Sequence, residues 1–180
     1  MTFLRLHLLQ IVFTLTAASI MPAANAGASA PTELPREIHS RIVALSQKGD
    51  GLAKQHKYAS AIQAYTDALK IVPLPIEKWE ASTWLLVAIG DAQFLSKNYV
   101  EAKSALTDAM RCPGAIGNPF IHLRLGQAQF ELGNMESASD ELARAYLPEG
   151  VAIFGADDPK YLRFIKSKLK PPPGGWPAGW

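Results

Sequence analysis

A triplet of small residues recurs three times along the chain, and it constrains the fold more than any other feature of the sequence. Each triplet has a glycine, an alanine 12 positions later and a second alanine 19 positions later. The copies are Gly49, Ala61 and Ala68; Gly90, Ala102 and Ala109; and Gly126, Ala138 and Ala145. Because the glycines are 41 and 36 residues apart, the pattern predicts stacked repeats in which each copy is one supersecondary unit.

The glycines interrupt segments that otherwise favour helix. A glycine inside a helix costs about 1 kcal/mol relative to alanine, so its recurrence needs a compensating gain in packing. We expect each glycine to face the alanines of its own repeat, since small side chains let two antiparallel helices approach closely. A larger side chain at that crossing would cost about 1–3 kcal/mol through overpacking. The triplets therefore predict three helix pairs.

Apolar and aromatic residues accompany the triplets in a similar order in each copy. Repeat one has Leu45, Leu52, Tyr58, Tyr65 and Pro73; repeat two has Leu86, Phe94, Tyr99 and Leu106; repeat three has Leu125, Phe130, Met135 and Leu142. This order resembles the tetratricopeptide repeat (TPR) family over residues 36–147. The resemblance implies an all-α, right-handed solenoid of about three antiparallel helix pairs with a C-terminal capping helix. Lys48 and His122 depart from the pattern, because an apolar residue is usual at both positions.

Helix signals and composition divide the chain into segments. The predicted segments are a signal peptide at 1–26, a flexible N-terminal segment at 27–34, a TPR-like domain at 35–147 with repeats at about 36–73, 77–113 and 119–147, a capping segment and helix at 148–170, and a Pro/Gly/Trp tail at 171–180. The capping helix begins after Asp158 as N-cap, and it supplies the apolar and polar faces that a terminal repeat needs. In the tail, Trp176 and Trp180 either dock onto the helices or stay exposed.

The first 26 residues have the layout of a secretory signal peptide. Arg5 precedes an apolar run of 13 residues, Leu8–Ile20, and small residues lead to Ala26. The alternative is an uncleaved anchor, which would need roughly 20 apolar residues. We therefore expect cleavage after Ala26, no stable membrane insertion of the mature chain, and export across the inner membrane to the periplasm.

Few residues point to catalysis or to a cofactor. Beyond the signal region, His39, His56 and His122 are too far apart for metal-ligand spacing. Cys112 is the only cysteine; we expect it to be buried, with an intermolecular bridge as the alternative. No glycine-rich loop follows a strand in the manner of a phosphate site. The sequence predicts a protein that is not an enzyme and that carries no metal or cofactor.

The resemblance implies that the functional surface is the concave face of the solenoid, which the first helix of each pair lines. Positions counted from the three glycines select eight candidate partner-binding residues: Asp50, Trp84, Asp91, Phe94, Phe120, Arg124, Gln127 and Phe130. Aromatic residues and arginine are frequent anchors of interfaces. We expect Asp50, Asp91 and Arg124 to be exposed. The four aromatic residues either contact a partner or pack between the repeats.

These residues predict a protein–protein interaction module that holds a peptide or a partner protein in its concave groove. One alternative is an immunity protein that neutralises a secreted bacterial toxin, because the ending Asp157–Trp176 resembles, less closely, the tails of small TPR proteins associated with such toxins. A second is a scaffold subunit of an envelope assembly, and a third is an enzyme or small-ligand binder. A net charge of +2 with both signs interspersed disfavours nucleic acid as a partner.

One class of partner is disfavoured by particular positions. Some TPR adaptors grip the acidic C-termini of cytosolic chaperones with a clamp of lysine, asparagine and arginine. The corresponding positions here are Ser46, Asp50, Ala88, Phe120 and Arg124. Since only the arginine is present, the sequence predicts that the chain has no chaperone carboxylate clamp.

Overall fold

The computed structural model describes residues 33–171 and 173–175 of the chain. The predicted signal peptide, nearly all of the segment 27–34, and Trp176 and Trp180 lie outside the described residues. Every regular element of the described part is a helix, and that part contains no strand. The elements are α2 (Arg36–Lys54), α3 (Tyr58–Lys70), η1 (Ile76–Lys78), α4 (Glu80–Leu95), α5 (Tyr99–Ala109), α6 (Pro119–Glu131), α7 (Met135–Glu149), η2 (Gly150–Phe154) and α8 (Pro159–Lys168).

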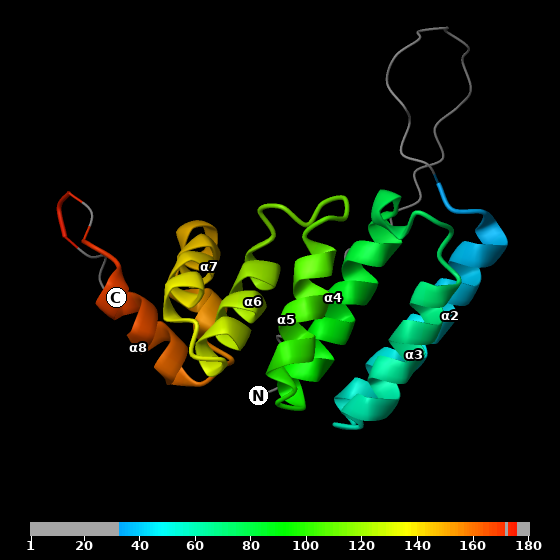
Figure 1. Cartoon of the computed structure of the whole chain (residues 1–180), viewed down its shortest axis with the longest axis horizontal. Coiled ribbons are helices and arrows are strands. Elements are labelled where there is room, and N and C mark those ends of the chain that lie inside the picture. The colour runs from blue at the N-terminus through cyan, green and yellow to red at the C-terminus, as the bar shows by residue number, and fades with distance from the viewer. Residues whose placement is uncertain (1–32, 172, 176–180) are drawn as a thin grey trace, which may run out of the picture.

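The long helices form three hairpins, α2–α3, α4–α5 and α6–α7, which lie side by side along the long axis of the molecule (Figure 1). Helix α8 follows at the end opposite α2. The predicted all-α solenoid of three helix pairs with a capping helix is therefore confirmed. Helix α7 continues through Pro148 to Glu149, beyond the end at 147 that the sequence predicts for the third repeat.

Each repeat glycine leaves a hole that a large side chain of its own repeat fills. A Cβ atom added at Gly90 would lie 2.6 Å from Cγ of Leu106, and one at Gly126 would lie 2.8 Å from Cγ of Leu142. At Gly49 it would overlap the ring of Tyr65. In all three hairpins the filling residue stands 16 positions after the glycine.

The prediction that each glycine faces the alanines of its repeat is therefore confirmed only in part, since the added Cβ at Gly90 would also lie 3.4 Å from the Ala102 carbonyl oxygen. The six alanines of the triplets are fully buried: Ala61, Ala68, Ala102, Ala109, Ala138 and Ala145. They keep the second helix close to its neighbours, but the side chain above each glycine is tyrosine or leucine. A tyrosine or leucine side chain that fills the space beside a glycine buries more apolar surface than two small residues in contact. This gain in burial offsets the low helix propensity of glycine.

The turn inside each hairpin has the same backbone conformation. The residue seven positions after each glycine has a left-handed φ angle: 58° at His56, 65° at Lys97 and 79° at Gly133. The N–H of the next residue donates to the carbonyl five positions earlier, at 2.9 Å in all three turns. This bond closes a Schellman-type helix end. The first two turns achieve it without the glycine that the position favours.

Side-chain caps fix the starts of two helices on either side of the third repeat. Asn118 Oδ1 accepts hydrogen bonds from the N–H groups of Phe120 and Ile121, at 3.0 and 3.4 Å, and Pro119 opens α6. Asp158 Oδ1 accepts from the Lys160 N–H at 2.9 Å at the start of α8. The predicted N-cap at Asp158 is confirmed, and Asn118 is an N-cap of the same kind. They place the aromatic residue Phe120 and helix α8 relative to the stack.

The polar residues of the core are few and mostly paired. His122, which replaces an apolar residue of the family pattern, is buried, and its Nδ1 lies 2.6 Å from Glu141 Oε2 on α7. Cys112 is buried and free, as predicted, and burial raises the pKa of its thiol. No helix of residues 33–171 combines the length and the apolar character required to cross a membrane.

Candidate partner-binding face

All eight candidate residues lie on the first helices of the hairpins: Asp50 on α2, Trp84, Asp91 and Phe94 on α4, and Phe120, Arg124, Gln127 and Phe130 on α6. We call the surface that α2, α4 and α6 form with these residues the first-helix face. The structure separates the candidates into two groups. Five are joined to Arg124 or to the C-terminal part of the chain by polar or ring contacts. The other three are Asp50, Trp84 and Phe120, of which Phe120 also flanks Arg124.

Arg124 is the centre of the first group. Its side chain is 0 % exposed. Its Nε lies 2.7 Å from Asp91 Oδ1, and its Nη1 donates to Gln127 Oε1 at 2.6 Å and to Asp157 Oδ1 at 3.5 Å. The contact with Asp91 is an ion pair in which the N–H does not point along a hydrogen bond. The expectation that Arg124 is exposed is therefore wrong. A buried guanidinium is expensive unless it is paired, and here two carboxylates supply the countercharge.

Two aromatic rings flank the same guanidinium. Its carbon Cζ lies 4.5 Å from the ring centroid of Phe94 and 5.4 Å from that of Phe120. Both distances are within the range of cation–π attraction. The candidates Phe94 and Phe120 thus shield the arginine from water. Phe94 is itself only 8 % exposed, so it packs between repeats rather than facing solvent.

Gln127 joins the arginine to the C-terminal part of the chain. Its side chain is fully buried, and its Nε2 donates to Asp157 Oδ2 at 3.0 Å while its Oε1 accepts from Arg124. Asp157 lies in the loop between η2 and α8, and its side chain is 5 % exposed. Asp157 is not among the eight residues that the sequence predicts for the binding face. The available signal was the pair of acids at 157 and 158, of which only Asp158 can cap α8.

A cluster of aromatic rings lies at the C-terminal ends of α4 and α6. The ring of Tyr161 on α8 is 5.5 Å from that of Phe130 and 6.3 Å from that of Phe94, measured between centroids. The Tyr161 hydroxyl donates to Glu131, whose carboxylate also pairs with the Lys160 ammonium. Burial, together with the Glu131 carboxylate, raises the pKa of Tyr161 above its ordinary range. Glu131 and Tyr161 were also missed by the sequence analysis.

The second group is Asp50, Trp84 and Phe120, which all keep part of their surface exposed. The Asp50 carboxylate accepts a hydrogen bond from the Tyr65 hydroxyl at 2.7 Å. Trp84 packs against the apolar cluster between the first and second hairpins, and Phe120 against the cluster between the second and third. The two aromatic residues each stand six positions before the glycine of their repeat, so neighbouring first helices present them at equivalent places.

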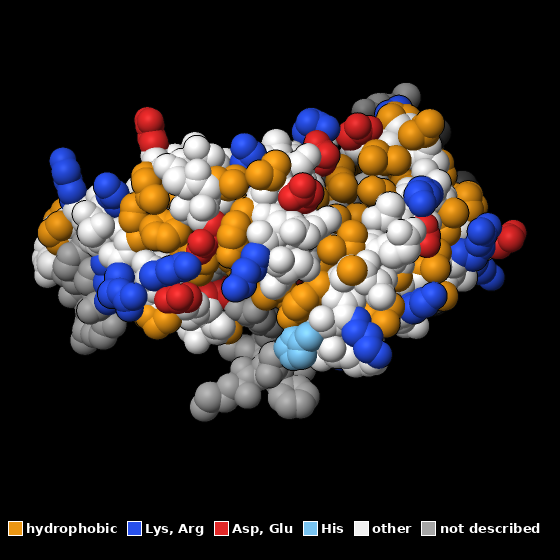
Figure 2. All heavy atoms as spheres, turned by 60° about the horizontal axis from the view of Figure 1, so that its bottom comes forward, with side chains coloured by type: hydrophobic (Ala, Val, Ile, Leu, Met, Phe, Trp, Pro, Cys, Tyr) orange, Lys and Arg blue, Asp and Glu red, His pale blue; other side chains and the backbone are white. Residues whose placement is uncertain are grey.

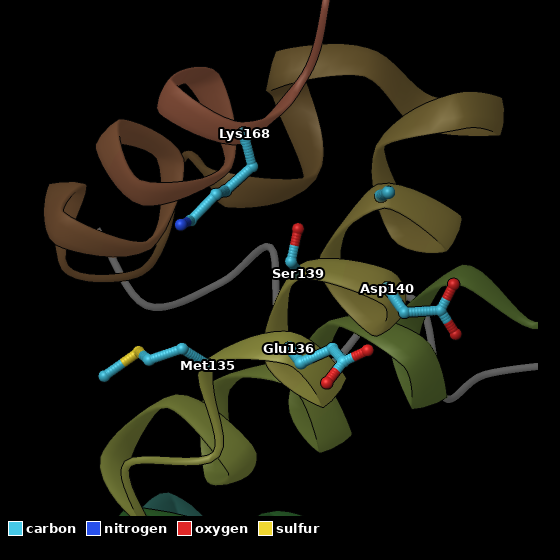
Figure 3. A pocket seen from close by; sticks show the side chains of 6 residues that line it. Met135, Glu136, Ser139, Asp140 and Lys168 are labelled. Atoms are coloured by element: carbon cyan, nitrogen blue, oxygen red, sulfur yellow. The ribbon is translucent and has the colours of Figure 1, made fainter.

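Two open hollows lie away from these residues. The larger, of about 560 Å³, is lined by Met135, Glu136, Ser139, Asp140 and Ala143 of α7 and by Lys168 of α8. Figure 3 shows Lys168 across from α7, with the Glu136 and Asp140 carboxylates turned away from its ammonium group. The other, of about 350 Å³, lies at the opposite end of the stack, between α2 and α3. Neither is lined by a candidate residue.

Charges of both signs are interspersed with hydrophobic side chains over the surface seen in Figure 2, and no large area of that view has a single sign. Within the described residues, no group of three or more His, Cys, Asp or Glu side chains is placed to hold a metal ion. The chemistry that the first-helix face offers is aromatic contact and hydrogen bonding.

The described fold is that of a helical-repeat protein built from helix hairpins. Among solved structures it is similar to the second TPR domain of human RPAP3 in complex with the HSP70 peptide SGPTIEEVD, with 21% identity, a TM-score of 0.55 and coverage of 74% of this chain and 99% of that domain. It is also similar to the C-terminal TPR-containing domain of a putative FK506-binding protein of Plasmodium falciparum, with 15% identity, a TM-score of 0.58 and coverage of 77% of this chain and 93% of that one.

The first TPR domain of human RPAP3 has a TM-score of 0.56 at 24% identity, over 71% of this chain and 94% of that domain. The chain thus has the tetratricopeptide repeat fold, as the sequence pattern predicted. No family model and no curated protein matches the sequence.

Proposed function

We propose that the chain is a non-enzymatic protein-interaction module, exported to the bacterial periplasm, that binds a peptide or partner protein on its first-helix face. One observation carries the proposal. Trp84 and Phe120 occupy equivalent places on adjacent first helices and are only partly buried, although both are large aromatic residues. Aromatic side chains that remain accessible on a repeat surface are suited to anchor a partner. The signal-like layout of residues 1–26 supports export.

The fold supports a peptide as the simplest partner. The similar second TPR domain of human RPAP3 is in complex with an HSP70 peptide. The chain differs from a chaperone clamp where charge would matter, because Arg124 is buried against Asp91 and Asp157. We therefore propose a partner held by apolar contact with Trp84 and Phe120 and by polar contact with Asp50, rather than one held by its terminal carboxylate.

The test is capture of partners by the mature chain, followed by substitution of its anchors. Immobilised protein is incubated with the envelope fraction, and bound proteins are identified by mass spectrometry. Trp84→Ala and Phe120→Ala are each expected to weaken binding of the captured partner at least tenfold, because loss of an aromatic anchor costs about 2 kcal/mol or more.

The matched control is Val100→Ala on α5, where the side chain is 59% exposed and lies outside the first-helix face. This variant should bind like the wild type. Circular dichroism of each variant shows whether its helices are intact. Full binding by folded Trp84→Ala and Phe120→Ala proteins would place the interface elsewhere. The identity of the partner also decides whether it is a toxin or a component of an envelope assembly.

A further inference from the structure

The C-terminal part of the chain covers half of the first-helix face. We define the C-terminal segment as residues 150–168, which comprise η2, the loop after it and α8. Its side chains contact Phe94, Arg124, Gln127 and Phe130, which are four of the eight candidate residues. These four belong to the second and third repeats. Asp50 on α2 and Trp84 near the start of α4 belong to the other half of the face.

One carboxylate of the segment contacts the buried polar part of the first-helix face. The Asp157 carboxylate reaches the two most deeply buried polar side chains of the face, Gln127 at 3.0 Å and Arg124 at 3.5 Å. Asp91 of the adjacent repeat lies on the other side of the same guanidinium. The Arg124 guanidinium and the Gln127 amide, both on α6, thus bind a carboxylate from a loop that lies later in the chain. A carboxylate bound in this way resembles one supplied by a ligand.

The apolar contacts follow four residues later. The Tyr161 ring enters the space between Phe94 and Phe130 and is 4% exposed. Its hydroxyl is held by Glu131. An acidic side chain in the loop before α8 and an aromatic ring in the first turn of α8 therefore contact two neighbouring first helices. Protein grooves recognise short peptides through anchor side chains of this kind.

The segment packs against α7 as well as α6, and one short helix, one turn and the loop between them supply all of its contacts. Phe154, Tyr161 and Ile165 are its buried apolar side chains, and Ile153, Leu162 and Phe164 are partly buried in the same cluster. These side chains must offset the loss of conformational entropy of 19 residues. A helix of ten residues such as α8 is not stable alone in water. The buried ion pair of Arg124 adds little net stability because both charges lose their hydration. Terminal elements held in this way open locally more readily than the core of a fold.

We propose that residues 150–168 are an internal ligand of the first-helix face, and that the site they occupy binds a segment with an acidic residue just before a helix and an aromatic residue four positions later, in the first turn of that helix. The acidic group contacts Arg124 and Gln127, and the ring lies between Phe94 and Phe130. This inference rests on the proposed function and extends it from Trp84, Phe120 and Asp50 to the adjoining half of the first-helix face, where Arg124 becomes accessible to a partner only when the internal copy is displaced. Its test does not need the natural partner.

The test uses a synthetic, fluorescently labelled peptide of residues 150–170, titrated against the full-length mature protein and followed by anisotropy. The double variant Asp157→Ala/Tyr161→Ala weakens the internal copy but leaves the site intact. The peptide is expected to bind this variant at least tenfold more tightly than the wild type. A peptide that carries the same two substitutions should lose at least tenfold in affinity for the variant.

Arg163→Ala is the matched control, because Arg163 is exposed on α8 and is not among the groups that contact the site. It should bind the peptide as weakly as the wild type. Equal binding of the peptide to wild type and double variant, or binding to neither, overturns the proposal.

Amide hydrogen exchange of the wild type tests the proposal independently, even if the double variant does not fold. The amides of α8 should exchange at least tenfold faster than those of α4 and α6, since the internal ligand opens while the repeats stay folded. Exchange of α8 at the same rate as α4 and α6 would show that the segment is an inseparable part of the core. That result also overturns the proposal.

Discussion

At the scale of single residues, the three repeat glycines and Gly51 show that glycine has different roles at different helical positions of the same fold. A Cβ atom added at Gly126 would meet the side chain of Leu142 at 2.8 Å and its backbone nitrogen at 2.9 Å. The backbone nitrogen cannot move without displacing α7. Around Gly51, by contrast, no atom lies within 4 Å of the added carbon. Packing therefore explains Gly126 but does not explain Gly51.

This contrast gives a pair of expected stability changes. Gly126→Ala should lower the free energy of unfolding by about 1–3 kcal/mol through overpacking, despite the better helix propensity of alanine. Gly51→Ala should raise it by up to about 1 kcal/mol, because the helix gains propensity and meets no obstacle. Urea unfolding followed by circular dichroism measures both. A stabilised Gly126→Ala protein would contradict the close packing of α6 against α7.

At the scale of elements, the hairpin turns repeat their geometry although their sequences differ. The left-handed position is occupied by His56, Lys97 and Gly133 in turn. Two further pairs of side chains support the later turns: Asn98 Nδ2 donates to Gln93 Oε1 at 2.9 Å, and Asn134 Nδ2 donates to Gln129 Oε1 at 2.8 Å. The geometry is thus imposed by the packing of the two helices, and a residue other than glycine bears a conformational cost there.

The left-handed turn position can therefore be tested by opposite substitutions in the second and third repeats. Lys97→Gly should stabilise the protein by about 1 kcal/mol, since the left-handed conformation costs a residue with a Cβ atom about 1–2 kcal/mol and glycine regains part of this as chain entropy. Gly133→Ala should destabilise it by a similar amount. Thermal unfolding of the two variants beside the wild type measures these shifts. Changes of the same sign at both positions would be inconsistent with the equivalence of the turns.

At the scale of the whole molecule, buried tyrosines link stability to alkaline pH. Burial, followed by the hydrogen bond to Asp50, raises the pKa of Tyr65, and burial with Glu131 does the same for Tyr161. A phenol whose pKa is raised in the folded state contributes stability that is fully present below the unfolded value, near pH 10. That stability is lost as the pH rises further, because the unfolded chain then releases protons that the folded chain retains.

The free energy of unfolding is therefore expected to fall above pH 10, by up to about 1.4 kcal/mol per pH unit for each of these tyrosines. Tyr65→Phe and Tyr161→Phe should each lower the stability at neutral pH, through loss of a hydrogen bond, and make its decline above pH 10 shallower. Chemical unfolding at a series of pH values between 8 and 11 tests the slope. An unchanged slope in both variants would show that neither phenol is protected in the folded state.

Local sequence determined much of this protein. The triplets that begin at Gly49, Gly90 and Gly126 predicted the number and order of the helix pairs, because a helix hairpin depends on residues close together in the chain. The caps Asn118 and Asp158 were predictable for the same reason, since each bonds to N–H groups two or three residues away.

Tertiary structure alone decided what fills the glycine holes and what covers the first-helix face. The periodic pattern placed Arg124 on the correct helix surface, but a solenoid position is exposed or buried according to what packs over it, and that is Asp157, 33 residues later. Contacts at such a separation depend on how the whole stack brings α4, α6 and α8 together. No spacing in the sequence records them, because these contacts depend on the packing of the helices between the partners and not on a local repeat of residues.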